Sequence, residues 1–172
     1  MTDATRMKTY TMFSFAITLL FAGTSYGLTV LETASEHQST APPLKSITIH
    51  QEVDFNASPQ RVYEALLDSK QFSAFSGRAA EINREAGGEF SLFNGHIIGR
   101  NLELIPNTRI VQAWRVVDWP QGVYSIARFE LTASGSGTHL VFDHKGFPEE
   151  LRDHLAEGWE ANYWSLLKKY FR

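Results

Sequence analysis

Histidine, serine and carboxylate side chains are the groups in this chain that could act as acids, bases, nucleophiles or metal ligands. The histidines considered for such a role are His96, His139, His144 and His154. They are scattered, without the i, i+4 pairs or neighbouring carboxylates that a metal site needs. A catalytic serine would need a tight, strained turn, whereas Ser134-Gly135-Ser136-Gly137 is typical of a hairpin loop. The sequence therefore predicts no catalytic residue, no metal site and no cofactor.

His144 is the histidine with the most chemical potential, because alternation places it on the same strand face as Leu140 and Phe142. Two interpretations stay open. His144 is either a hydrogen-bonded histidine at the rim of the core, or a pocket imidazole that orients a polar ligand group or shuttles a proton. In an enzyme of the isomerase or cyclase type, His144 and Glu103 are the residues that could supply the acid or base.

Large aromatic residues point into the same predicted interior, and two polar residues accompany them. Gln112 shares a strand face with Trp114, and Asn162 lies on the helix stripe. Polar groups among rings are costly unless they are paired or hydrated, and an apolar cavity with a few polar groups is the usual small-molecule site. Ordinary core packing is the alternative for each ring. The expected ligand-binding residues are Gln112, Trp114, Phe129, Phe142, His144, Trp159 and Tyr163.

A sheet must position most of these side chains, and residues 87–115 predict its centre. The segment holds three apolar runs of period 2, which are Phe90/Leu92, Ile98/Leu102/Leu104 and Ile110/Gln112/Trp114. Runs this close together predict an antiparallel meander, with Asn94-Gly95 as a hairpin tip at positive φ. Further strands are expected at residues 47–55, 124–132 and 138–145. Trp119 is expected on a loop, as a lid or a partner-binding anchor.

Helices complete the predicted architecture. Ser58 and Pro59 are suited to the N-cap and first position of a short helix, and residues 69–75 suit a second one. The longest helix is expected at residues 149–170. Its apolar stripe is Leu151, Leu155, Gly158/Trp159, Asn162/Tyr163, Leu166/Leu167 and Tyr170. An antiparallel sheet must cover its apolar face, so we predict an α+β helix-grip fold, a curved antiparallel sheet wrapped around this helix with two short helices after the first strand.

Composition narrows the class of partner. The chain has 172 residues, 43% of them hydrophobic and 13% aromatic, which is enough for one folded domain with a core or a pocket. A net charge of −3 argues against nucleic acid as the main partner. Cysteine is absent, which excludes disulfides and thiol chemistry.

The N-terminal region has the pattern of a targeting segment. Arg6 and Lys8 precede an apolar run at residues 12–23, and the small residues Ser25 and Gly27 follow it. We expect residues 1–27 to be a signal peptide, or else an N-terminal membrane anchor, and the protein to be exported or anchored. Residues 28–45 are expected to be a flexible tether, and residues 46–172 the folded domain.

The folded part also resembles a known family. The matching pieces are Ala57-Ser58-Pro59, Gly87-Gly88 with Phe90, Glu103-Leu104-Ile105-Pro106, Trp114-Arg115, His144-Lys145-Gly146-Phe147-Pro148, and Gly158-Trp159 with Tyr163-Trp164. Their order and spacing resemble the START-like (SRPBCC) superfamily, and within it the C-terminal domain of the activator of heat-shock protein 90 ATPase.

This resemblance implies two functions of different class. Most single-domain START-like proteins are reputed to bind small hydrophobic molecules or to have no known activity, so the resemblance implies as a first expectation a non-enzymatic domain that holds such a ligand between the sheet and the C-terminal helix. The second is a co-chaperone-type interaction domain that stimulates the heat-shock protein 90 ATPase, which requires a cytosolic location. A cavity of roughly 300 Å³ or more favours the first, and an exposed patch on the convex sheet favours the second.

Overall fold

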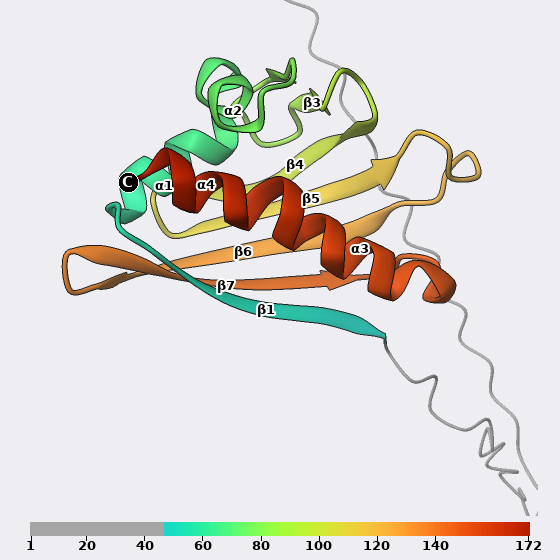
Figure 1. Cartoon of the computed structure of the whole chain (residues 1–172). Coiled ribbons are helices and arrows are strands. Elements are labelled where there is room, and N and C mark those ends of the chain that lie inside the picture. The colour runs from blue at the N-terminus through green and yellow to red at the C-terminus, as the bar shows by residue number, and fades with distance from the viewer. Residues whose placement is uncertain (1–46) are drawn as a thin grey trace, which may run out of the picture. The chain divides into compact units, whose positions relative to one another are not determined.

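One curved antiparallel sheet forms the framework of the protein (Figure 1). The computed structural model describes residues 47–172. The strands are β1 (Thr48–Phe55), β2 (Glu81–Ile82), β3 (Glu89–Leu92), β4 (Ile97–Ile105), β5 (Arg109–Val116), β6 (Ser125–Ser134) and β7 (Gly137–Lys145). Their order across the sheet is β1-β7-β6-β5-β4-β3-β2. Strands β3 to β7 pair in sequence order, as the predicted meander requires, and β1 pairs with β7 at one edge of the sheet.

Two short helices follow β1, and local side chains begin both. Helix α1 (Pro59–Leu67) begins with Pro59, and the Ser58 hydroxyl accepts a hydrogen bond from the Arg61 amide at 3.4 Å. Helix α2 (Ser69–Ser76) has Asp68 as its N-cap residue. The Asp68 carboxylate accepts hydrogen bonds from the Lys70 and Gln71 amides. These caps satisfy amides that have no partner within the helix. The predicted pair of short helices is confirmed.

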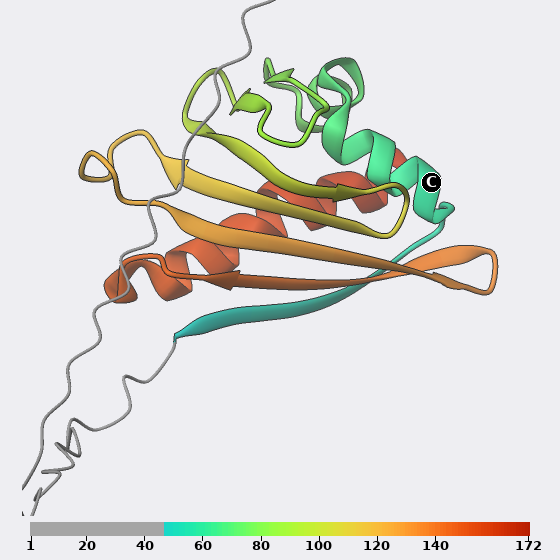
Figure 2. The ribbon, with the colours of Figure 1, turned by 180° about the vertical axis from the view of Figure 1, so that it is seen from behind.

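The C-terminal helix lies across the concave face of the sheet, and Figure 2 shows the opposite face free of helices. The helix consists of consecutive segments, which are η1 (Glu149–Leu151), α3 (Arg152–Trp159), η2 (Glu160–Trp164) and α4 (Ser165–Tyr170). Segment η2 is a π-helical turn, in which the Ser165 amide donates to the Glu160 carbonyl. The helix-grip fold and the covering role of this helix are confirmed.

The π turn shifts the buried stripe by one residue. Up to Tyr163 the stripe follows the predicted positions, but beyond it Trp164, Leu167 and Phe171 are buried. Tyr170, which was predicted to face inward, is 38% exposed. A π turn holds one residue more than an α turn, so every later position rotates relative to the α-helical pattern. The expectation for Tyr170 was therefore wrong.

Strand β4 also departs from its predicted pattern. Its buried positions are Ile97, Gly99 and Asn101, whereas Leu102 is 49% exposed. The register shifts between Asn101 and Glu103, so Leu102 is the extra residue of a β-bulge. The buried position of Gly99 requires glycine, because a Cβ there would lie 2.0 Å from the Ala113 carbonyl oxygen and 2.3 Å from the Phe90 ring. The predicted apolar positions Ile98, Leu102 and Leu104 thus did not identify the buried face of β4.

The segments predicted at residues 1–27 and 28–45 lie outside the described residues. Within residues 47–172, no helix is long and apolar enough to span a membrane.

Candidate functional site

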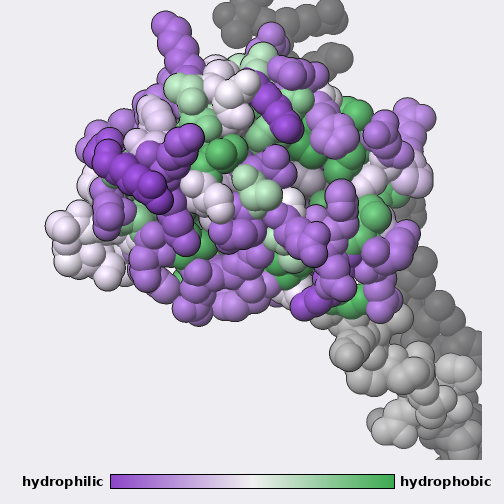
Figure 3. All heavy atoms as spheres, in the orientation of Figure 1, coloured by the Kyte–Doolittle hydropathy of each residue, from purple (hydrophilic) through white to green (hydrophobic). Residues whose placement is uncertain are grey.

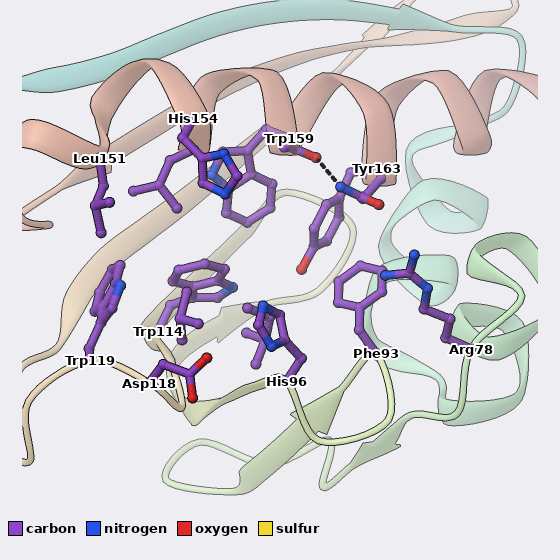
Figure 4. Close-up of a pocket in the computed structure, with 15 residues that line it drawn as sticks. Arg78, Phe93, His96, Trp114, Asp118, Trp119, Leu151, His154, Trp159 and Tyr163 are labelled. Carbon is purple, nitrogen blue, oxygen red and sulfur yellow. Dashed lines mark hydrogen bonds between the residues drawn. The ribbon is translucent and has the colours of Figure 1, made fainter.

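A pocket of about 350 Å³ opens between the first half of the C-terminal helix and the end of the sheet where β4 begins and β5 ends (Figure 4). The residues that line it are Arg78, Phe93, His96, Ile97, Trp114, Val116, Asp118, Trp119, Leu151, His154, Leu155, Gly158, Trp159, Asn162 and Tyr163. Its volume lies in the range of small-molecule sites, and its wall includes the aromatic rings of Phe93, Trp114, Trp119, Trp159 and Tyr163.

The helix wall of the pocket is the predicted stripe. Leu151, Leu155, Trp159 and Tyr163 succeed one another at intervals of four residues, so they share one helix face. Gly158 lies within this wall, and a Cβ built on it meets nothing within 4 Å. The missing side chain leaves the room that makes the wall concave. The π turn η2 carries Asn162 and Tyr163, and such turns recur at functional sites.

The sheet wall is formed by the turn between β3 and β4 and by the end of β5. This turn holds Phe93, Asn94 and Gly95 at φ values of 54°, 59° and 86°, which confirms the predicted tip and adds Phe93 to it. Positive φ is unfavourable for a bulky side chain. Packing fixes the Phe93 ring, since its centroid lies 5.2 Å from that of Tyr163. The turn thereby presents an aromatic ring to the pocket.

Two polar atoms lie among the rings. The indole Nε1 of Trp114 is buried and has no hydrogen-bond partner among the described residues. Burial raises the pKa of the Tyr163 hydroxyl, and hydrogen bonding from the Trp114 indole lowers it, so the Trp114 N–H lies within reach of the Tyr163 oxygen although the two groups make no well-formed hydrogen bond. Figure 4 shows the Tyr163 oxygen and the Trp114 nitrogen directed toward the same part of the pocket. The pocket thus has an apolar wall with convergent polar groups.

Arginine, histidine and aspartate side chains of the pocket are confined to its rim. Arg78, His96, Asp118 and His154 all line the pocket and are all exposed. The Arg78 guanidinium lies 5.6 Å from the centre of the Phe93 ring, at a distance typical of a cation–π contact. The rim is therefore hydrated, while the interior of the pocket contains no charged side chain.

His144 lies behind the pocket in a hydrogen-bonded chain. The Trp159 indole donates to Nδ1 of His144 at 3.1 Å, so Nε2 carries the proton and donates to the Ser125 hydroxyl at 2.7 Å. The Ser125 hydroxyl in turn donates to the Trp114 carbonyl at 2.8 Å. Burial lowers the pKa of His144 to about 3. A neutral imidazole that donates to this serine cannot act as its general base, so the arrangement is not that of a catalytic serine.

The structure divides the seven predicted ligand residues into two groups. Trp114, Trp159 and Tyr163 line the pocket, and so does Asn162, which the sequence placed on the same helix face. The remaining four are core residues that do not line it, and they are Gln112, Phe129, Phe142 and His144. Gln112 donates to Asn101 at 3.0 Å, and this buried polar pair joins β4 to β5.

Glu103 and His144, the two residues considered for an enzyme, lie in different places. Glu103 accepts a hydrogen bond from Arg109 at 3.0 Å at the half-exposed surface of the sheet, while His144 is buried. Arg109 also bonds Glu130, which Arg128 contacts in turn. The two residues are therefore not brought together.

Further carboxylates flank histidines on β1 and β7. Asp54 lies opposite His139 in the strand register and bonds it at 2.9 Å, and Asp143 bonds His50 at 2.8 Å. The expectation that His139 has no neighbouring carboxylate was wrong, because the pairing of distant strands brings Asp54 beside it. Within the described residues, no group of three or more such side chains could hold a metal ion.

Sequence reasoning missed the pocket residues supplied by loops. Arg78 and Phe93 come from connections, and nothing in the sequence pattern aims them at the helix. A second hollow of about 700 Å³ lies over edge strands β2 to β4, and it includes the exposed ion pair of Glu89 and Arg100. Its wall lacks the aromatic enclosure of the first pocket. The first pocket is therefore the candidate site.

Comparisons with known proteins agree with this fold. Residues 56–172 match the family model described as Activator of Hsp90 ATPase homolog 1-like protein. An activator of 90 kDa heat shock protein ATPase homolog from Dictyostelium discoideum is 30% identical over 131 residues, which are 76% of this chain and 34% of that protein. A human activator of 90 kDa heat shock protein ATPase homolog 1 is 26% identical over 117 residues, which are 68% of this chain and 35% of that protein.

Among solved structures, an HSP90 activator from Plasmodium falciparum has a TM-score of 0.69 at 24% identity and covers 72% of this chain and 95% of its own. The chain spans about a third of the length of the curated relatives it matches. The predicted family resemblance is confirmed: the chain belongs to the family of Activator of Hsp90 ATPase homolog 1-like proteins.

Proposed function

We propose that this protein is a non-enzymatic binding module that holds a small apolar or aromatic molecule in the pocket between the sheet and the C-terminal helix. The observation that carries the proposal is the pocket itself, with about 350 Å³ enclosed by Trp114, Trp159, Tyr163 and other rings. Half-buried Gly158 supports it, because the absent side chain leaves open space on the helix wall of the pocket.

The chemistry of the wall sets the class of ligand. Burying about 300 Å² of apolar ligand surface contributes roughly 7 kcal/mol, from which the costs of association and ordering are subtracted. We therefore expect affinities in the micromolar range. Rings are expected to suit the site best, since Trp114 and Trp119 lie in edge-to-face contact at 5.6 Å and offer further rings the same geometry.

Tryptophan fluorescence tests the proposal. Trp114, Trp119 and Trp159 all line the pocket, so a ligand that enters should change the emission of the full-length protein. Titration against a panel of lipids, sterols and aromatic compounds should give saturable changes for some members, with a parallel rise in melting temperature. A panel that changes neither signal would contradict the proposal.

A second candidate function comes from the family. The relatives from Dictyostelium and human are named activators of the heat shock protein ATPase. In support, β4 to β7 carry a row of charged residues, including Glu103, Arg109, Glu130 and Asp143, that could meet a charged partner. Figure 3 shows the face that carries the C-terminal helix. Its residues are mainly hydrophilic, with hydrophobic ones in separate patches. A chaperone contact through charges is the form this function would take.

The test of this candidate is the ATPase rate of the host's heat-shock protein 90 with and without the full chain. Stimulation that Glu130→Lys abolishes would support a charged docking surface, and a rate equal to that with an unrelated protein would contradict it.

The cellular location of the protein also separates the two functions. Export, which the N-terminal sequence predicts, would remove the protein from cytosolic chaperone and ATP.

A further inference from the structure

One buried donor in the pocket makes no well-formed hydrogen bond. Among residues 47–172, Nε1 of Trp114 is the one buried side-chain polar atom without a hydrogen-bond partner. The other fully buried indoles are bonded, since Trp159 donates to His144 and Trp164 donates to Gln51. Leaving a buried donor unsatisfied destabilises a protein, so native structures rarely do it without a functional reason. The Tyr163 oxygen lies within reach of this N–H but forms no well-formed hydrogen bond with it. Because Trp114 lines the pocket, a bound molecule can supply a better-placed acceptor.

A second donor lies beside the first. Three neighbouring rings hold the Tyr163 ring, with Phe93 at 5.2 Å, Phe72 at 5.7 Å and Trp159 at 4.2 Å between ring centroids. This packing fixes the direction of the hydroxyl before any ligand arrives, which lowers the ordering cost of binding. Burial also raises the pKa of Tyr163 above its usual value, so the hydroxyl keeps its proton at physiological pH.

The charged residues of the pocket determine whether the acceptor group of a bound molecule is neutral or anionic. Arg78 and Asp118, the permanently charged residues that line the pocket, are exposed at its rim and carry opposite signs. No cation accompanies the two donors inside. An anionic group at that depth would lose its hydration without gaining a counter-ion, whereas a neutral carbonyl or ether oxygen has two lone pairs for two donors.

We infer that the pocket selects molecules with an apolar ring system and an uncharged oxygen at the buried end, which accepts hydrogen bonds from the Trp114 indole and the Tyr163 hydroxyl. This inference rests on the proposed binding function and specifies the ligand class. The residues expected to fix the polar end of the ligand therefore change. Gln112 is hydrogen-bonded to Asn101, and His144 is hydrogen-bonded to Ser125 and Trp159.

Matched pairs of probes test the inference on the full-length protein. The pairs are 1-tetralone with tetralin, and 2-acetylnaphthalene with 2-isopropenylnaphthalene, in which the members differ mainly by the carbonyl oxygen. The ketone of each pair should bind roughly tenfold more tightly than the hydrocarbon. Trp114→Phe and Tyr163→Phe, which keep a ring but remove a donor, should each reduce that ratio severalfold. Leu151→Ala is the control, because it removes apolar wall only and should weaken both members equally.

Nuclear magnetic resonance gives a direct second readout. The chain has four tryptophans, so a ¹⁵N-labelled sample should show four indole N–H resonances. The Trp114 resonance should move farther downfield with each ketone than with its matched hydrocarbon, while the resonance of Trp164, which does not line the pocket, changes little. Equal binding within the pairs, with an equal shift of the Trp114 resonance, would overturn the inference and leave the proposed function standing. Absence of binding by all four probes, with no resonance perturbed, would contradict the proposed function and the inference with it.

Discussion

His144 is the residue whose chemistry the fold constrains most. It is fully buried, accepts from Trp159 and donates to Ser125, so both ring nitrogens are used and the neutral form is required. The same contacts tie β6 and β7 to the C-terminal helix. Of the two sequence interpretations of His144, these contacts support the hydrogen-bonded core histidine.

The folded state should therefore lose stability in mild acid. The unfolded chain takes up a proton at this imidazole near pH 6.5, whereas burial lowers the pKa of His144 in the folded protein to about 3. Between these values the unfolded state binds more protons, so stability is complete above pH 6.5 and falls as the pH decreases. From pH 6.5 to pH 5 the loss from this group should be about 1–2 kcal/mol.

Denaturant unfolding at several pH values measures this effect. His144→Phe should be less stable than the wild type but should lose the extra dependence on pH in this range. His154→Phe, which removes an exposed histidine, is the control and should keep the wild-type dependence. Identical pH profiles for the wild type and His144→Phe would show that the imidazole is not held neutral by the fold.

At the scale of elements, the π turn η2 decides which residues of the C-terminal helix are buried. It allows Trp159, Tyr163 and Trp164 to face the sheet together, with ring centroids 4.2 Å and 5.8 Å from Trp159. The 3.6-residue period predicted the helix and its first half correctly. A π turn has no signal in hydrophobic periodicity, and for this reason the sequence could not place Trp164 and Phe171 in the core.

A pair of alanine substitutions tests this shift in the helix. Phe171 is 5% exposed and packs edge-to-face on Phe55 at 5.9 Å, so Phe171→Ala should reduce the free energy of unfolding by at least about 2 kcal/mol. Tyr170 is 38% exposed, and Tyr170→Ala should cost about 1 kcal/mol or less. Chemical denaturation of both variants is the measurement. The reverse order of losses would mean that the helix continues without a π turn.

Most of the framework was predictable because strands, hairpin tips and caps have local signals. Asn94-Gly95, Ser58 and Pro59 are examples, and each takes the role that its chemistry indicates. The pocket was predictable only in part. The helix stripe identified Trp159 and Tyr163, but the space at Gly158 and the inward turn of Phe93 depend on how distant segments pack, which no local pattern encodes.

At the scale of the whole molecule, the N-terminal region bears on which function is available. Arg6 and Lys8, the apolar run at residues 12–23 and the small residues Ser25 and Gly27 predict export with cleavage near Gly27. Mass spectrometry of protein purified from its native host should therefore find a new N-terminus near Leu28. Recovery of soluble chain beginning at Met1 or Met7 from the cytosol would contradict export and leave the co-chaperone function available.

Substitution at Gly158 tests whether the pocket binds a small molecule. A Cβ at this position meets nothing within 4 Å, so both Gly158→Ala and Gly158→Leu should fold, with alanine favoured in a helix over glycine by up to about 1 kcal/mol. The measurement is the dissociation constant of the tightest-binding compound of the panel for the wild type and both variants. Gly158→Ala should bind within about threefold of the wild type, whereas the leucine side chain should fill the pocket and weaken binding at least tenfold. Equal affinity in all three proteins, with folding intact, would contradict binding in this pocket.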